Sequence, residues 1–94
     1  MNSTNEKEKI EYNIIVTRIS IKNYNEPTPS NIKKIYNKIN TNQIFGASNV
    51  VEILNCSYAT AKAIINKLHK DIDVIVPVIG FGKGKYRFKN KGEE

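Results

Sequence analysis

The stretch VVEILNCSYATAKAIINKL, residues 50–68, decides the fold. Its second half repeats apolar side chains at Ala61, Ile64, Ile65 and Leu68. At about 100° per residue these side chains gather on one side of a helix, which we predict from Tyr58 to about Lys70. That side should pack into a core, and the other side should face away from the domain.

The outward side of this predicted helix carries small and polar residues. They are Ala59, Ala63, Asn66 and Lys70, with Lys62 and Lys67 at the flanks. Alanine is also the best helix former, and lysine commonly solvates an exposed helix surface. From these residues alone, the outward side is either a solvated surface or a binding surface.

Two further helices are predicted upstream. SNIKKIYNKIN, residues 30–40, gives an amphipathic helix, and NVVEILN, residues 49–55, gives a shorter one. Ser48 is placed to accept a hydrogen bond from the free amides that begin the shorter helix. Between the two lies TNQIFG, residues 41–46, where Ile44 and Phe45 form a short strand or fill the core.

Downstream, DVIVPVIGFGKGKYRFK, residues 73–89, predicts two antiparallel strands joined by a glycine loop. Pro77 has no N–H to donate, so its strand should lie at an edge or carry a bulge. Phe81 has little local core to join. Three positions are open to it: inserted into a groove, against a partner, or folded back onto the sheet.

The N-terminal segment EYNIIVTRISIKNYN, residues 11–25, is rich in β-branched residues. Its alternation favours a strand, although Ile10, Ile14, Thr17 and Ile21 also form a helical stripe. We predict an N-terminal extension over 10–29, a domain over 30–89, and disordered tails at 1–9 and 90–94.

Composition indicates one small globular domain with an anionic partner. The 94 residues are 39% hydrophobic and 26% charged, with a net charge of +6. Basic and acidic residues balance over 1–29, but basic residues outnumber acidic ones from Ser57 onward. The positive potential is therefore expected on the C-terminal half, as in nucleic-acid-binding proteins.

Several functional classes are not expected. No apolar run is long enough to span a membrane and no signal layout begins the chain, so a cytoplasmic protein without a membrane partner is predicted. Cys56 is the only cysteine, so no internal disulfide is expected. Cys56 and His69 alone are too few ligands for a zinc site, and no cofactor is expected. No nucleophile has a plausible base, and GFGKGK lacks the GxxxxGK[ST] spacing, so we do not expect an enzyme.

From about Ile32 to Phe88 the chain resembles the winged helix-turn-helix superfamily of DNA-binding domains. The family's spacing of apolar, small and hydroxyl residues is occupied here by Val51, Leu54, Cys56, Ser57, Thr60, Ala61, Ile64 or Ile65, and Leu68. Asn55 stands where the family most often has glycine, and asparagine also tolerates the left-handed conformation. The resemblance implies an α+β fold: three helices and a C-terminal β-hairpin wing, preceded here by an N-terminal extension of strand or helix.

The resemblance also implies a function, namely sequence-specific binding of double-stranded DNA by a small bacterial or phage-type transcriptional regulator. The 58–70 helix would enter the major groove, with the 80–85 loop as the wing. The residues expected at DNA are Ser57, Tyr58, Ala59, Thr60, Lys62, Ala63, Asn66, Lys67, Lys83, Lys85 and Arg87. Among them, Asn66 suits adenine, Lys62 suits guanine or phosphate, and the wing cations suit phosphates or the minor groove.

Two further expectations concern partners. A small domain usually needs two half-sites, so a homodimer formed through the apolar segment 10–29 is predicted. The alternative function is a winged-helix module for protein–protein interaction, or an accessory subunit of a larger assembly, without DNA binding.

Overall fold

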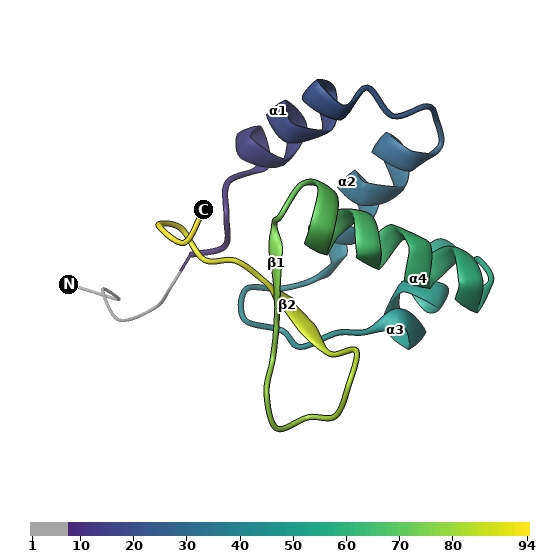
Figure 1. The fold of residues 1–94 in the computed structure, drawn as a ribbon, viewed down its shortest axis with the longest axis vertical. Helices are drawn as coiled ribbons and strands as arrows, with labels where there is room; N and C mark the ends of the chain where they lie inside the picture. Colours follow the sequence, from purple (N-terminus) through teal and green to yellow (C-terminus); the bar gives the residue numbers. More distant parts are fainter. Residues whose placement is uncertain (1–7) are drawn as a thin grey trace.

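The computed structural model describes residues 8–94, which form a small α+β fold with four α-helices and a two-stranded antiparallel sheet. In chain order the elements are α1 (Tyr12–Lys22), α2 (Thr28–Lys38), α3 (Ala47–Leu54), α4 (Tyr58–Asn66), the π-helical turn η1 (Lys67–Asp71), β1 (Ile75–Pro77) and β2 (Tyr86–Phe88). Figure 1 shows α1 and the loop between β1 and β2 at opposite ends of the long axis.

The helix α4 follows the sequence prediction closely. The Oγ of Ser57 accepts a hydrogen bond from the backbone N–H of Thr60 at 3.1 Å, which caps the first turn. All four side chains of the predicted seam, Ala61, Ile64, Ile65 and Leu68, are buried. The only difference is at the end, where the last turn is the π-helical η1.

The helices α2 and α3 are confirmed, but the predicted cap of α3 is wrong. The helix begins at Ala47 and its N-cap is Gly46, so Ser48 already lies inside the first turn. The Oδ1 of Asn49 accepts a hydrogen bond from the N–H of Gly46 at 2.9 Å. An asparagine three residues after the cap therefore satisfies the amide of the cap residue itself, and Ser48 does not cap the helix.

A tight turn joins α3 to α4 through Asn55, Cys56 and Ser57. Asn55 ends α3 in the left-handed conformation, with φ 53° and ψ 49°. Its N–H donates to the carbonyl of Val51, and the N–H of Cys56 donates to the same carbonyl at 3.3 Å. Asparagine thus takes the backbone conformation that the sequence required at this position.

The favoured strand in the N-terminal segment is wrong, because this segment forms α1. The helical stripe offered as the alternative is also shifted: Ile15 and Ile19 are buried, whereas Ile21 is 75% exposed. Packing of Ile15 and Ile19, one turn apart, outweighs the weak strand preference of β-branched residues. Ile10, Ile15 and Ile19 belong to the same core as the rest of the chain, so they do not form a free apolar surface. Dimerisation stays a prediction.

Two cations, Lys9 just before α1 and Arg18 within it, form hydrogen bonds with the rest of the fold. The Nζ of Lys9 donates to the carbonyls of Tyr36 and Ile39 at 2.6 and 2.7 Å, at the C-terminal end of α2. Burial lowers the pKa of Lys9. Arg18 donates to the carbonyls of Ile72 and Asp73 at 3.0 and 2.9 Å, just after η1. Both cations lie where a helix leaves carbonyl groups unpaired.

The short sheet holds the hairpin against the helices. β1 pairs with β2 from Ile75 opposite Phe88 to Pro77 opposite Tyr86. On the other side of β2, Phe45 and Tyr86 exchange two backbone hydrogen bonds of 2.8 Å. β1 is therefore an edge strand, as Pro77 predicted. Phe45 is also fully buried and stacks on Phe88, so it both pairs and fills the core.

The two ends of the described chain pair with each other. Residues 1–7 of the predicted N-terminal tail lie outside the described residues. Lys9 forms an antiparallel bridge with Asn90, which is 4% exposed, and Lys91 Nζ lies 2.9 Å from a carboxylate oxygen of Glu8. The segment 90–94 thus contains a turn whose first two residues pair with the start of the described chain.

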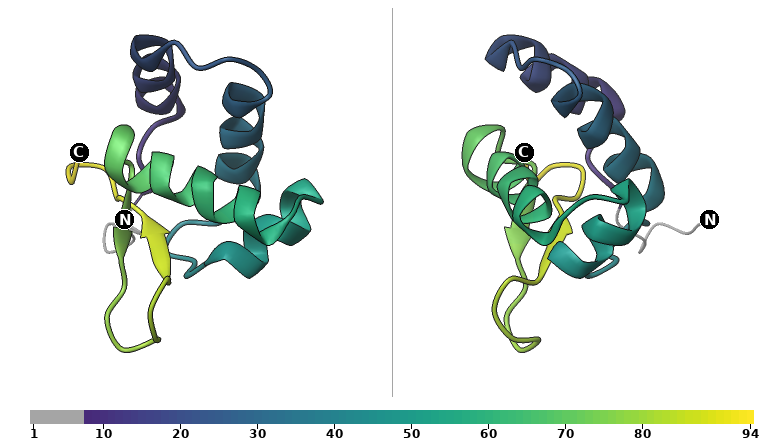
Figure 2. Two further views of the ribbon diagram at one scale, coloured as in Figure 1. Left: turned by 45° about the vertical axis from the view of Figure 1, so that its right-hand side comes forward. Right: turned by 90° about the vertical axis from the view of Figure 1, so that its right-hand side faces the viewer.

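In both views of Figure 2, the loop between β1 and β2 projects away from the body, below α3 and α4. Helix α4 crosses beneath α1 and α2 (Figure 1). Across residues 8–94, no helix has the length and apolar character needed to cross a bilayer.

Candidate nucleic-acid interface

An open groove of about 330 Å³ lies between α3, α4 and the second limb of the hairpin loop. Residues far apart in the sequence line it: Ala47 and Ser48 from α3; Tyr58, Lys62, Ile65 and Asn66 from α4; and 83–86 from the loop and β2. The groove exists because the pairing of Phe45 with Tyr86 brings the start of α3 beside the hairpin. It therefore joins two segments that the sequence predicted separately, the helix and the wing.

The groove is basic. Lys62 lies on one wall, Lys83 and Lys85 lie on the other, and no acidic residue lines it. Among the described residues, the salt bridges all lie elsewhere: Arg87 with Glu93, Lys89 with Asp73, and Lys91 with Glu8 and Glu11. None of the three groove lysines forms a salt bridge with a carboxylate of residues 8–94. Positive charges on both sides of such a cleft act together on an anion.

The exposed side of α4 continues this surface. Ala59, Lys62, Ala63 and Asn66 are all exposed and lie on one face of the helix. Two of them are alanines, so the helix backbone is not screened by long side chains. The arrangement confirms the predicted outward face and gives a narrow helix surface with a cation and an amide at its edge.

A close backbone contact sets the distance between α3 and the loop. A Cβ built on Gly46 would lie 2.7 Å from the carbonyl oxygen of Gly84. Backbone atoms cannot move aside as a flexible side chain can, so only glycine fits at this position without a shift. Gly46 therefore fixes how near Lys83 and Lys85 come to α4.

Five of the predicted DNA contacts line the groove: Tyr58, Lys62, Asn66, Lys83 and Lys85. Tyr58 is 59% exposed, and Lys62 Nζ lies 5.7 Å from the centre of its ring. An aromatic face beside a cation can stack on a base or sugar. These five residues offer positive charge, an amide with donor and acceptor, and an aromatic surface within one groove.

Other predicted contacts lie beside the groove. Ser57 and Thr60 are exposed, but their hydroxyl groups bond to each other at 2.9 Å across the first turn of α4. Ala59 and Ala63 lie on the exposed face of α4. Lys67 is half-buried at the start of η1 and does not line the groove.

Arg87 does not join the other predicted contacts. Its Nη1 and Nη2 lie 2.9 and 3.1 Å from the two carboxylate oxygens of Glu93, and Nη1 also donates to the carbonyl of Phe88. The bond to Glu93 raises the pKa of the guanidinium. Because Arg87 alternates with Tyr86 and Phe88 along β2, it leaves the sheet on the other face. Its charge is already neutralised there.

Sequence reasoning missed Ala47, Ser48 and Tyr86 as groove residues. Their signal is non-local: only the pairing of Phe45 with Tyr86 brings these positions together. The aromatic–basic alternation around Tyr86 was visible, but it gave no indication of the partner strand.

The tip of the hairpin loop is apolar and stands free. Ile79 is 93% exposed and Phe81 is 57% exposed, and neither belongs to the core. Of the three positions considered for Phe81, folding back onto the sheet is therefore wrong. The two side chains therefore expose apolar surface to solvent at the loop tip.

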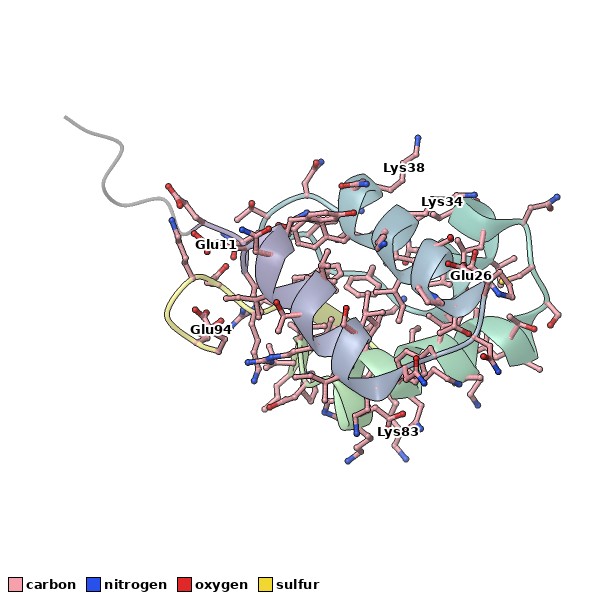
Figure 3. The ribbon with its side chains drawn as sticks, turned by 90° about the horizontal axis from the view of Figure 1, so that it is seen from above. Glu11, Glu26, Lys34, Lys38, Lys83 and Glu94 are labelled. Carbon is pink, nitrogen blue, oxygen red and sulfur yellow. The ribbon has the colours of Figure 1, made fainter. Side chains whose placement is uncertain are left out.

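Figure 3 places Lys83 on the edge opposite Lys34 and Lys38, with Glu11 and Glu94 together at a third edge. The acidic residues near the two chain ends are therefore separated from the groove.

Among residues 8–94, no cluster of three or more His, Cys, Asp or Glu side chains is arranged to hold a metal ion. Comparisons with protein-family models, curated proteins and solved structures find no match for this chain.

Proposed function

We propose that this protein is a winged helix-turn-helix protein that binds double-stranded DNA and acts as a small transcriptional regulator. In this proposal α4 is the recognition helix, residues 55–57 form the turn, and residues 78–85 form the wing. The observation that carries the proposal is the basic groove with Lys62 on the helix side and Lys83 and Lys85 on the wing side.

The dimensions of DNA support this assignment. The major groove of B-DNA is about 12 Å wide and admits one α-helix. With the exposed face of α4 in that groove, the small side chains of Ala59 and Ala63 allow a close approach, and Asn66 can pair with an adenine edge. One sugar-phosphate strand then lies in the basic groove, where Lys62, Lys83 and Lys85 neutralise its phosphates.

The test measures binding to a fluorescent random-sequence duplex by anisotropy over a range of salt concentrations. The double variant Lys83→Ala/Lys85→Ala should bind more weakly than the wild type. Because each phosphate contact contributes about 0.9 to the slope of log affinity against log salt, this variant should lower the magnitude of that slope by about 1.8.

The matched control is Lys34→Ala/Lys38→Ala. These two exposed lysines lie on α2, on the opposite edge from Lys83, and the control has the same net charge as the test variant (Figure 3). It should keep the slope of the wild type. If both double variants lost the same affinity and salt slope, net charge alone would attract DNA and the groove would not be the binding site. If the wild type did not bind the duplex at low salt, the DNA-binding function would be rejected.

The alternative function, a protein-interaction module or accessory subunit, is favoured by one observation. Ile79 and Phe81 expose apolar surface of a kind that also occurs in protein interfaces. The salt dependence separates the two functions, because a protein contact through these side chains would not depend on Lys83 and Lys85 releasing counterions from DNA.

A further inference from the structure

The loop tip of the hairpin is built to present Phe81. The last hydrogen bond between the two limbs runs from the N–H of Val78 to the carbonyl of Lys85 at 2.9 Å. Beyond it, Gly80 and Gly82 flank Phe81 with φ of 98° and 87°, in the region that side-chain-bearing residues rarely adopt. Nothing lies within 4 Å of the space where a Cβ on either glycine would be. The two glycines therefore place no side chain next to the phenyl ring, which is 57% exposed.

The surroundings of the tip are cationic. From Val78 to Lys85 the loop has no acidic residue, and Lys83 and Lys85 lie two and four residues after Phe81. An apolar tip on a basic loop suits an anionic partner that also offers an apolar surface. The stacked bases of DNA, reached between two phosphate strands, combine these two properties.

The basic groove indicates which side of DNA the tip would meet. A single sugar-phosphate strand divides the major groove from the minor groove. If that strand lies between Lys62 on α4 and Lys83 on the loop, α4 is on its major-groove side and the loop is on its minor-groove side. The tip beyond Lys83 then reaches the minor groove, which is about 6 Å wide.

The geometry points to Phe81 as a wedge that enters a base step from the minor groove and bends the duplex, with Ile79 as a second apolar contact. This inference rests on the proposed function. Apolar side chains inserted from the minor groove partly unstack a step and kink DNA toward the major groove. Pyrimidine–purine steps such as TpA unstack most easily, so the wedge would favour sites with such a step at the correct distance from α4.

The test uses energy transfer between dyes at the two ends of a duplex of about 30 base pairs, short relative to the persistence length of DNA. One probe is A/T-rich and contains TpA steps, and the other has the same composition arranged in stiff A-tracts. Wild-type protein should increase transfer on the TpA probe at saturation and much less on the A-tract probe.

Phe81→Ala should remove most of this increase while weakening binding by no more than about tenfold, since the loss of the wedge also removes the cost of bending. Ile79→Ala should give a smaller loss. The control Ile21→Ala truncates another exposed isoleucine, 75% exposed on α1, and should bend DNA like the wild type. Thermal unfolding of the tip variants should match the wild type, because neither side chain is in the core.

The possible failures are distinguishable. Equal bending by wild type and Phe81→Ala, or binding without bending, overturns the wedge and leaves DNA binding intact. Absence of binding to both probes at low salt overturns the wedge and the proposed function together.

Discussion

Positively charged side chains have different surroundings in two regions of this molecule. Where the chain ends meet, Lys91 lies between Glu8 and Glu11, at 2.9 and 3.4 Å, and Arg87 is held by Glu93. At the groove between α4 and the hairpin, the lysines have no acidic neighbour lining the same surface. Paired cations serve the fold, and unpaired cations are the ones available to a partner.

This comparison shows why a net charge is a poor guide to a binding surface. The excess of basic residues after Ser57 includes Arg87, Lys89 and Lys91, all of which are in salt bridges. Only the cations that remain outside these salt bridges are available to a partner. Ion pairs that are partly exposed add little stability, so breaking one at the paired end should cost at most about 1 kcal/mol.

The largest effect is expected when the groove is forced apart through its backbone. Gly46→Ala places a Cβ against the carbonyl of Gly84, and relief requires the loop to move from α3. We expect the free energy of unfolding to fall by about 1 to 3 kcal/mol. DNA binding should also weaken, because Lys83 and Lys85 move away from α4.

Chemical denaturation and anisotropy check this prediction, with Ser48→Ala as the stability control. Ser48 is exposed and neighbours the same helix start, so its truncation should change stability by less than about 0.5 kcal/mol. A Gly46→Ala variant as stable as Ser48→Ala would show that the contact with Gly84 does not fix the groove.

An intermediate effect is expected from removing one paired cation and one unpaired cation. Arg87→Met breaks the pair with Glu93, whose side chains are 26% and 40% exposed, and should cost at most about 1 kcal/mol of stability. Lys83→Ala should leave stability unchanged. In DNA binding the order should reverse, because Lys83→Ala lowers the salt slope by about 0.9 and Arg87→Met hardly changes it.

Chemical denaturation gives the free energy of unfolding of each variant, and the salt titration gives the slope of log affinity against log salt. If Arg87→Met lowers the salt slope as much as Lys83→Ala does, Arg87 exchanges Glu93 for a phosphate on binding. A cation in a salt bridge would then also be able to contact DNA.

The smallest effect concerns the hydrogen bond between Tyr24 and the carboxylate of Asp71. Burial, together with a hydrogen bond to Asp71 at 3.1 Å and the charge of that carboxylate, raises the pKa of Tyr24 to about 12. The folded state therefore favours the neutral phenol. Its contribution to stability is complete below the unfolded pKa of about 10 and is lost as pH rises from there through the folded value.

Phenolate absorbance during an alkaline titration checks this. Tyr24→Phe should remove the ionisation near pH 12. Asp71→Asn should move the pKa of Tyr24 downward, since it removes the charge that opposes the phenolate. A titration unchanged by Asp71→Asn would mean that burial alone sets the pKa.

The elements that could be predicted from sequence are those specified by local patterns. The seam of α4, the left-handed Asn55 and the edge position of Pro77 each follow from a single residue or a short spacing. The signal for α1 was ambiguous, because β-branched residues suit strands and the buried pair Ile15 and Ile19 also fits alternation.

The groove was less predictable because its geometry comes from non-local contacts. One residue, Phe45, pairs with Tyr86 and brings the start of α3 beside the hairpin, and a single pair leaves no periodic pattern in the sequence. Similarly, no pattern in the sequence around Arg87 predicts its salt bridge with Glu93. The sequence identified all three groove lysines, but only the fold separates the unpaired cations from the paired ones.

The pairing of Phe45 with Tyr86 has a kinetic consequence. Two hydrogen bonds of 2.8 Å hold the base of the hairpin to the helices before any partner arrives. A preorganised surface loses little conformational entropy on association. We therefore expect encounter with an anionic partner to be limited by electrostatically guided diffusion, not by a rearrangement of the protein, so that the association rate constant rises as ionic strength falls.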